Sequence, residues 1–253
     1  MVNKYNNNYL TNVIVRIDFS DELQIHDKLP SDLTKSILKF FPIPEPKKLV
    51  GRTIKISPEK KVEMEGDDLV KTEWNYYGQN RNKRLVLDPS FLSITYKKYE
   101  SFEQLKSEFI EIIAKLYDVF GEDINTSRLG LRYINEISLD ETNPLDWDKY
   151  LNKNLLSAFS FPKDKSSISR IFNKIILNYG DEILHFNYGM HNPDYPAPIK
   201  KKLFVLDYDA YHEGYQEFDE LEYYLKSCHE IIENIFEESI TDALRGVMND
   251  GRL

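Results

Sequence analysis

Two stretches of this sequence repeat the same order of apolar positions, and this internal similarity constrains the fold more than any other feature. In each stretch a strand-like run leads into an aromatic residue that opens an amphipathic helix, Phe102 in the first and Phe218 in the second. The apolar positions that match at one fixed offset are Leu105, Phe109, Leu116 and Phe120 in the first stretch and Leu221, Leu225, Ile232 and Phe236 in the second. Similarity at a fixed offset favours an internal duplication over a chance likeness of two amphipathic patterns.

Strands are expected upstream of both helices. Alternation and turn residues predict strands at Val70–Tyr77 and Leu85–Leu87 around the loop Gly78–Arg84, and at Ile171–Tyr179, Glu182–Tyr188 and Leu203–Leu206, the last two joined by the loop Gly189–Lys202. We therefore expect an α+β protein of two pseudo-repeated units, each an antiparallel sheet packed against a long helix. The expected units are residues 1–140 and 141–253, unless the two form one continuous domain.

Further elements complete this outline. Val13–Phe19 alternates as a half-buried strand, and so does Leu129–Ile137. A helix is expected from Ser31 until the prolines at 42, 44 and 46 stop it. A second is expected over Trp147–Phe159. The C-terminal helix should run without a break from Leu221 to Val247, about 28 residues, because apolar residues recur there every three or four positions.

Composition excludes several classes of protein. The chain is 41% hydrophobic, which is enough apolar mass to exclude a disordered tail. No apolar run reaches the roughly 18 residues of a membrane span, and the first residues lack a signal-peptide segment. Cys228 is the single cysteine, so it has no internal disulfide partner. These features predict a cytoplasmic protein without a membrane partner.

The negative charge is concentrated in the second half of the chain. Residues 127–253 contain 14 basic and 22 acidic residues and so hold most of the net charge of −9. An acidic surface repels phosphate backbones and favours basic partners, although solubility alone would also explain it. Nucleic acid is therefore the less favoured partner.

Motifs for chemistry are sparse. Glycine-rich phosphate loops, zinc-ligand spacings and nucleophile elbows are missing from the sequence, so no cofactor is expected. Asp207 and Asp209 lie two residues apart and should share a strand face, as a two-carboxylate catalytic or Mg²⁺ site requires. His185, His191 and Asp194 are a weak candidate set for a divalent metal. The residues of both sets can also be explained as ordinary strand or loop residues.

The two predicted loops are the better candidates for binding. Each combines cations with aromatic residues, which suits either bases and phosphates or the contact centre of a protein interface. If the duplication is real, the loops are equivalent and can face one partner together. The interaction residues predicted in and beside them are Trp74, Tyr77, Arg81, Lys83, Arg84, His191 and Tyr195.

The order of elements resembles a sporadically distributed bacterial protein family of uncharacterised activity. Three segments carry the likeness: Val13–Phe19, Leu131–Asn135 and Phe236–Leu244. The resemblance implies no catalytic residues, because that family has none assigned. Its sporadic occurrence implies a place in bacterial antiviral defence or toxin–antitoxin loci.

These observations predict a non-enzymatic protein-interaction module, a subunit or regulator of such a complex. Two alternatives stay open. One is a metal-dependent nuclease or phosphodiesterase that uses Asp207 and Asp209 with His185 or His191. The other is a nucleic-acid-binding or nucleotide-binding component that uses Arg81, Lys83 and Arg84.

Overall fold

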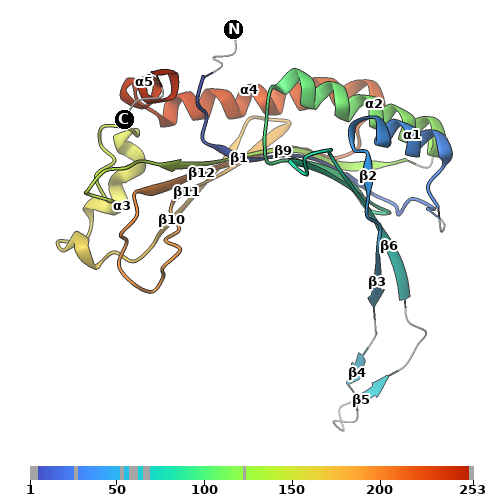
Figure 1. Cartoon of the computed structure of the whole chain (residues 1–253), viewed down its shortest axis with the longest axis horizontal. Helices are drawn as coiled ribbons and strands as arrows, with labels where there is room; N and C mark the ends of the chain where they lie inside the picture. Colours follow the sequence, from blue (N-terminus) through green and yellow to red (C-terminus); the bar gives the residue numbers. More distant parts are fainter. Residues whose placement is uncertain are drawn as a thin grey trace.

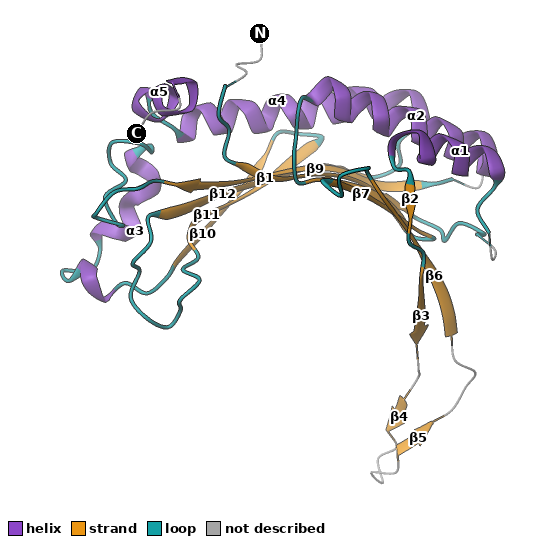
Figure 2. Cartoon of the chain, in the orientation of Figure 1, coloured by secondary structure: helices purple, strands orange, loops and turns teal. Residues whose placement is uncertain are grey.

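The computed structural model describes residues 5–25, 28–51, 54–56, 62–64, 69–121 and 124–250. Most of the strands form one large sheet, and long helices run along it (Figures 1 and 2). The strands are β1 (Leu10–Phe19), β2 (Ile43–Pro44), β3 (Lys47–Gly51), β4 (Ile54–Ile56), β5 (Val62–Met64), β6 (Leu69–Tyr77), β7 (Lys83–Asp88), β8 (Phe91–Tyr96), β9 (Thr126–Ser138), β10 (Ile171–Asn178), β11 (Glu182–Met190) and β12 (Leu203–Glu213). The helices are α1 (Ser31–Phe40), α2 (Phe102–Phe120), α3 (Ser157–Ser160), α4 (Leu221–Ser239) and α5 (Asp242–Asp250). The protein is therefore α+β, as the sequence predicts.

The large sheet has the strand order β10-β11-β12-β9-β1-β8-β7-β6-β2, with β3 also pairing with β6. Every neighbouring pair is antiparallel. The strands β1 and β9 lie together at its centre and pair along most of their length. The sheet is continuous across residue 140, since β9 precedes that position and β12 follows it. The hairpin of β3 and β6 extends away from the sheet toward the separate pair of β4 and β5 (Figure 1).

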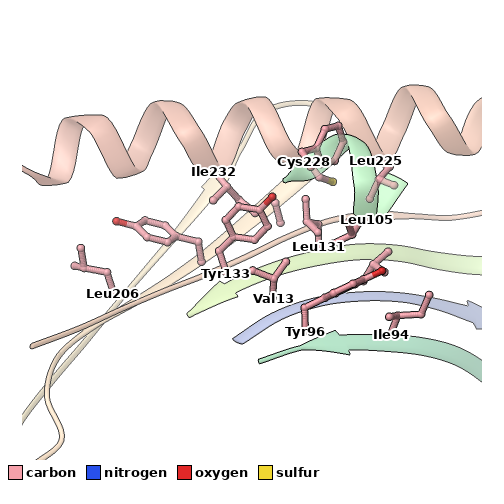
Figure 3. Close-up of a cluster of buried hydrophobic side chains, with 14 of the residues drawn as sticks. Val13, Ile94, Tyr96, Leu105, Leu131, Tyr133, Leu206, Leu225, Cys228 and Ile232 are labelled. Atoms are coloured by element: carbon pink, nitrogen blue, oxygen red, sulfur yellow. The ribbon is translucent and has the colours of Figure 1, made fainter. Parts of the chain in front are cut away.

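One face of the sheet is covered by helices, and the core lies beneath them. The helices α1, α2 and α4 all run along the same face, on the convex side of the curved sheet (Figure 1). Alternate residues of β1 point toward them, and Val13, Val15 and Ile17 are fully buried. Leu105 of α2 and Leu225 of α4 enter the same core (Figure 3). Burial of such side chains is the main favourable term in folding.

The two long helices begin differently although both follow the last strand of a hairpin. The Ser101 side chain caps α2 by accepting a hydrogen bond from the backbone N–H of Gln104. A 3₁₀ turn at Phe218–Glu220 precedes α4, and the Glu217 and Glu220 side chains cap it reciprocally. Each cap satisfies backbone donors that would otherwise lack a partner.

Two helix predictions were wrong. The segment Trp147–Phe159 is a turn, a short 3₁₀ helix and then α3, not one helix. The C-terminal helix breaks at Ile240, where the chain becomes extended and bridges to Leu151. The Thr241 N–H also donates to the carbonyl of Tyr150. These hydrogen bonds satisfy backbone groups at the helix end, so tertiary pairing overrides the apolar periodicity.

Two similar Val-Leu-Asp runs precede the long helices, one ending at Asp88 and the other at Asp207, and they lie in different places in the sheet. Asp88 ends β7 and accepts hydrogen bonds from the Ser90 backbone N–H and hydroxyl, and the chain then turns into β8. Asp207 lies in the middle of β12, which continues to Glu213 without a turn. Similar strand residues before each helix therefore occupy different places in the two halves.

In the part of the chain that the structure describes, no helix has the length and apolar character needed to cross a membrane.

Candidate functional site

Within the residues that the structure describes, no helix covers the face of the sheet opposite α1, α2 and α4, and we call this face the open face (Figure 2). Its side chains are the residues that alternate with the core residues along each strand. On β1 they include Ile14, Arg16 and Asp18, which are partly exposed, whereas their neighbours Val15 and Ile17 are fully buried. The open face is therefore a broad surface of partly exposed side chains held on rigid strands.

A network of charged and aromatic side chains crosses the open face. The Arg16 guanidinium lies 4.0 Å from the ring centre of Phe91 on β8 and donates to the Asp18 carboxylate, at 2.8 Å from its Nε. Arg128 on β9 lies with Nη1 3.9 Å from the other oxygen of Asp18. Arg128 Nη2 lies 3.1 Å from Asp209 on β12. The network thus connects four adjacent strands, and networks of this kind hold side chains in defined positions.

The network continues to β11 through an aromatic residue. The Arg128 guanidinium lies 4.4 Å from the ring centre of Tyr211, and the Tyr211 hydroxyl lies 3.2 Å from His185 Nε2. Gly130 makes room for this arrangement, because a Cβ atom there would lie 2.6 Å from Arg128 Nη1. The absent side chain at Gly130 lets the Arg128 side chain lie flat across β9.

Arg132 and Asp207 form the strongest pair of this face. Arg132 Nε and Nη2 each donate to a different oxygen of the Asp207 carboxylate at 2.7 Å, a two-bond geometry that combines charge with direction. The Asp207 side chain is only 10% exposed, so the pair is held in a partly desolvated environment. Bonding to Asp207 raises the pKa of the Arg132 guanidinium.

Charges on the open face are balanced in sign. The other recorded pairs are Lys71 with Asp88 at 2.9 Å and Arg84 with Glu73 at 3.3 Å. The Lys71 pKa is raised, chiefly by its hydrogen bond to Asp88. Because carboxylates neutralise these cations, the face lacks the excess of positive charge that binds a phosphate backbone.

The edge strand β10 adds apolar surface to the open face. Phe172 and Ile176 alternate on that side, at 59% and 58% exposed, and pair across from Gly189 and His185 of β11. Exposed apolar side chains on an edge strand are a common feature of interaction sites, since unpaired backbone groups lie beside them.

The structure uses the predicted basic loop differently from the sequence prediction. Lys83 and Arg84 belong to β7, and Lys83 Nζ lies 2.7 Å from both oxygens of the Glu108 carboxylate. Arg84 bonds to Asn75, and Arg81 pairs with Glu45. Three internal acceptors therefore neutralise or occupy the cations that were expected to meet a ligand.

The aromatic residues beside that loop also have internal roles. Tyr77 packs under the guanidinium of Arg81, whose carbon lies 4.9 Å from the ring centre. Trp74 points to the helix-covered face and packs partly buried against the core. Of the two, Tyr77 alone lies on the open face.

The second loop contributes one aromatic residue that is more than half exposed. Tyr195 is 55% exposed, with the Arg170 guanidinium 4.1 Å from its ring centre. His191 packs against Phe172 at 4.6 Å between ring centres. Burial is the main reason that the His191 pKa is lowered.

The two loops are not equivalent in topology. The first joins β6 to β7, two strands before α2, whereas the second joins β11 to the strand directly before α4. Strand register nevertheless brings both to the end of the sheet where β1 begins: Lys83 pairs across from Tyr96 and Leu203 from Ser138. Both loops therefore lie at the same end of the strands, with the central strands of the sheet between them.

The candidate metal residues do not converge. His185 and His191 lie six positions apart along and just beyond β11, roughly 20 Å for an extended chain. His185 forms a hydrogen bond with the Tyr211 hydroxyl, and the His191 ring packs on Phe172. Among the described residues, no group of three His, Cys, Asp or Glu side chains could hold a metal ion.

Asp207 and Asp209 do share one strand face, as their spacing predicts, and that face is the open face. Each carboxylate is bonded to an arginine of β9, Asp207 to Arg132 and Asp209 to Arg128. Because arginine side chains occupy both carboxylates, the arrangement suits recognition better than acid–base catalysis.

Sequence reasoning missed the cross-strand network itself. Arg16, Asp18, Arg128 and Arg132 stand at the polar positions of two alternating strands. That alternation was the available signal, because polar residues on two strands of one sheet share a face whenever the strands are neighbours. The missing information was that β1 and β9 pair with each other.

Comparisons with known proteins add little. No protein-family model and no curated protein matches the chain. Among solved structures, Methanococcus jannaschii TBP is similar over 92% of this chain and 99% of its own, at 12% sequence identity and a TM-score of 0.31. At this TM-score the likeness supports no conclusion about fold or function.

Proposed function

We propose that this protein is a non-enzymatic interaction module that binds a protein partner on its open face. The observation that carries the proposal is the ten-stranded sheet with α1, α2 and α4 along one side, which leaves the other side as a broad surface in the described part of the chain. The setting, a subunit or regulator of a bacterial antiviral defence or toxin–antitoxin complex, is supported by the family resemblance alone.

The chemistry of the open face favours protein over nucleic acid. Arg is enriched at the energetic centres of protein interfaces, and Arg16 and Arg128, whose side chains are 43% and 25% exposed, lie on the two central strands of this face. The exposed Phe172 and Ile176 add apolar area at its border. A nucleic acid would have to displace carboxylates from the arginines that it needs for phosphate contacts.

The two halves of the sheet also support a duplication, which we infer to consist of β1 to α2 and β9 to α4. Each half has a central strand, three later sequential antiparallel strands of the same sheet and a long helix: β1 with β6, β7, β8 and α2, or β9 with β10, β11, β12 and α4. In the first half, α1 and β2 to β5 come between β1 and β6. This division would move the expected boundary from residue 140 to the connection between α2 and β9. A solved structure in which the halves fail to superimpose would contradict the duplication.

Affinity purification of the tagged full chain from its source cells tests the proposed function. We expect one stoichiometric protein partner with the native chain. Phe172→Glu and Ile176→Glu should reduce recovery of that partner by about tenfold, because each puts a charge into an apolar contact area. The matched control is Tyr223→Glu, at a somewhat more exposed position on α4, on the opposite side of the sheet.

Two results would contradict the proposal. One is recovery of no stoichiometric protein with the native chain. The other is equal loss of the partner with all three variants. Association with nucleic acid that weakens steeply as salt rises would instead favour the nucleic-acid reading.

A further inference from the structure

A cavity of about 710 Å³ lies on the helix-covered side of the molecule, away from the open face. It lies between the N-terminal segment, the start of α2 and one side of α4, and its floor includes Tyr133 of β9. Figure 3 shows Tyr133 extending from β9 toward α4, beside Ile232. Cavities of this size accommodate small molecules or single side chains.

A chain of hydrogen bonds ends in the wall of this cavity. The Tyr99 and Tyr133 hydroxyls lie 2.8 Å apart, and the Tyr133 hydroxyl lies 3.0 Å from His229 Nδ1. The His229 ring stacks on Phe102 at 3.9 Å between ring centres. These contacts fix the imidazole, so that its other nitrogen has one defined direction.

That other nitrogen, His229 Nε2, is buried and has no hydrogen-bond partner among the described residues. The His229 side chain is only 6% exposed, and Nε2 lies 3.4 Å from a Glu233 oxygen without hydrogen-bond geometry. Burial lowers the His229 pKa to about 4, so the ring is neutral near pH 7. A buried polar atom without a partner destabilises the empty site, and a ligand that bonds to this atom recovers that loss.

The surrounding charge is negative, and one carboxylate stands apart. Glu230 lies 3.7 Å from Lys226, and Glu237 bonds to Arg245 at 2.8 Å. For Glu233, the only ion pair recorded in the described part of the chain is with the neutral His229. Burial and the nearby Glu237 and Glu230 raise the Glu233 pKa by more than the amino terminus of the chain lowers it. A cation that contacts the Glu233 carboxylate beside His229 would relieve this repulsion.

We propose that the cavity binds an organic ammonium group. The N–H bonds of the ammonium would point to His229 Nε2 and to the Glu233 carboxylate, while aromatic rings enclose its carbon atoms. In this state His229 carries its proton on Nδ1 and donates to Tyr133, which donates to Tyr99. Phe102 and Tyr133 supply ring surface of the kind that attracts cations.

Isothermal titration calorimetry on the full chain tests this site with three probes. Spermidine represents a free amine, and Nα-acetyl-lysine amide represents a lysine side chain of a protein. Succinate is the anionic comparison, because the N-terminus of α2 also borders the cavity and would favour an anion. Saturable binding of either amine supports the proposal, and the stronger of the two identifies the source of the ammonium.

The variant Glu233→Gln should weaken amine binding by at least about tenfold, because it removes the charge of a charge-assisted hydrogen bond but keeps the shape. Tyr99→Phe should weaken it less, since it removes only the end of the hydrogen-bond chain. The matched control is Glu238→Gln, an exposed position on α4 outside the cavity, which should leave affinity unchanged.

Three outcomes would overturn the proposal. They are absence of saturable binding by both amines, tighter binding of succinate, and equal weakening by Glu233→Gln and Glu238→Gln. Circular dichroism of each variant shows whether the fold is kept. The open face plays no part in these measurements, so their failure leaves the proposed function untouched.

Discussion

Replacing Lys83 with Met should destabilise the fold, because it leaves the Glu108 carboxylate buried without its cation. The Glu108 side chain is 6% exposed, and Lys83 Nζ contacts both of its oxygens at 2.7 Å. Tyr96 and Gln104 still donate to the same carboxylate, at 2.8 and 3.0 Å. Breaking one side of a buried ion pair costs about 3–5 kcal/mol, and the two remaining donors place Lys83→Met near the lower end.

Urea unfolding at neutral pH measures this loss. We expect the free energy of unfolding to fall by about 3 kcal/mol, with a drop in Tm of about 6–12 °C for a chain of this size. The double variant Lys83→Met with Glu108→Gln should recover much of the loss, because no unpaired charge is left. Lys97→Met, at an exposed neighbouring position, should change stability by less than about 0.5 kcal/mol.

A Lys83→Met variant as stable as the native chain would refute this reasoning. It would mean that the buried Glu108 carboxylate does not need Lys83, which would leave Lys83 available to a ligand. The alternative in which Arg81, Lys83 and Arg84 bind a nucleic acid or a nucleotide would then regain support.

Three further predictions concern single residues. Arg132→Met should lower the free energy of unfolding in urea by about 1–3 kcal/mol, because it leaves the nearly buried Asp207 without its partner. Arg16→Met should lower it less, because its partner Asp18 is more exposed. The folded-state pKa of His229 is about 4, below its ordinary value of 6.5, so it contributes stability at higher pH that is lost as pH falls from 6.5 toward 4. The loss is on the order of 3 kcal/mol, and a His229→Gln variant should lack this part of the pH dependence of unfolding. Burial raises the Cys228 pKa to about 12, so a thiol reagent should modify it only in denaturant; rapid labelling of the native chain would contradict its burial.

Local patterns predicted most strands of the large sheet and the starts of the three helices that cover it, but not β2 or β3. The alternation in Val13–Phe19 identified β1 and its buried face, because a strand with one covered side must alternate. Prolines located the end of α1. The spacing of Asp207 and Asp209 placed both on one face. In each case the determining interaction lies within a few residues.

Features that depend on distant partners were out of reach. The break at Ile240 follows from its pairing with Leu151, which no pattern near Ile240 reveals. The sequence places Lys83 in a basic loop, whereas in the structure β7 and α2 bring its side chain to Glu108. The open face likewise follows from the pairing of β1 with β9, which gathers polar residues from distant segments.

Photo-crosslinking from the open face in the source cells tests the central claim most directly. A photoreactive residue at Ile14, on the open face at the centre of the sheet, should give a covalent adduct with one protein partner. The same residue at Tyr223, on the exposed side of α4, should give none. An adduct from Tyr223 but not from Ile14, or an adduct of Ile14 with nucleic acid, would contradict the account.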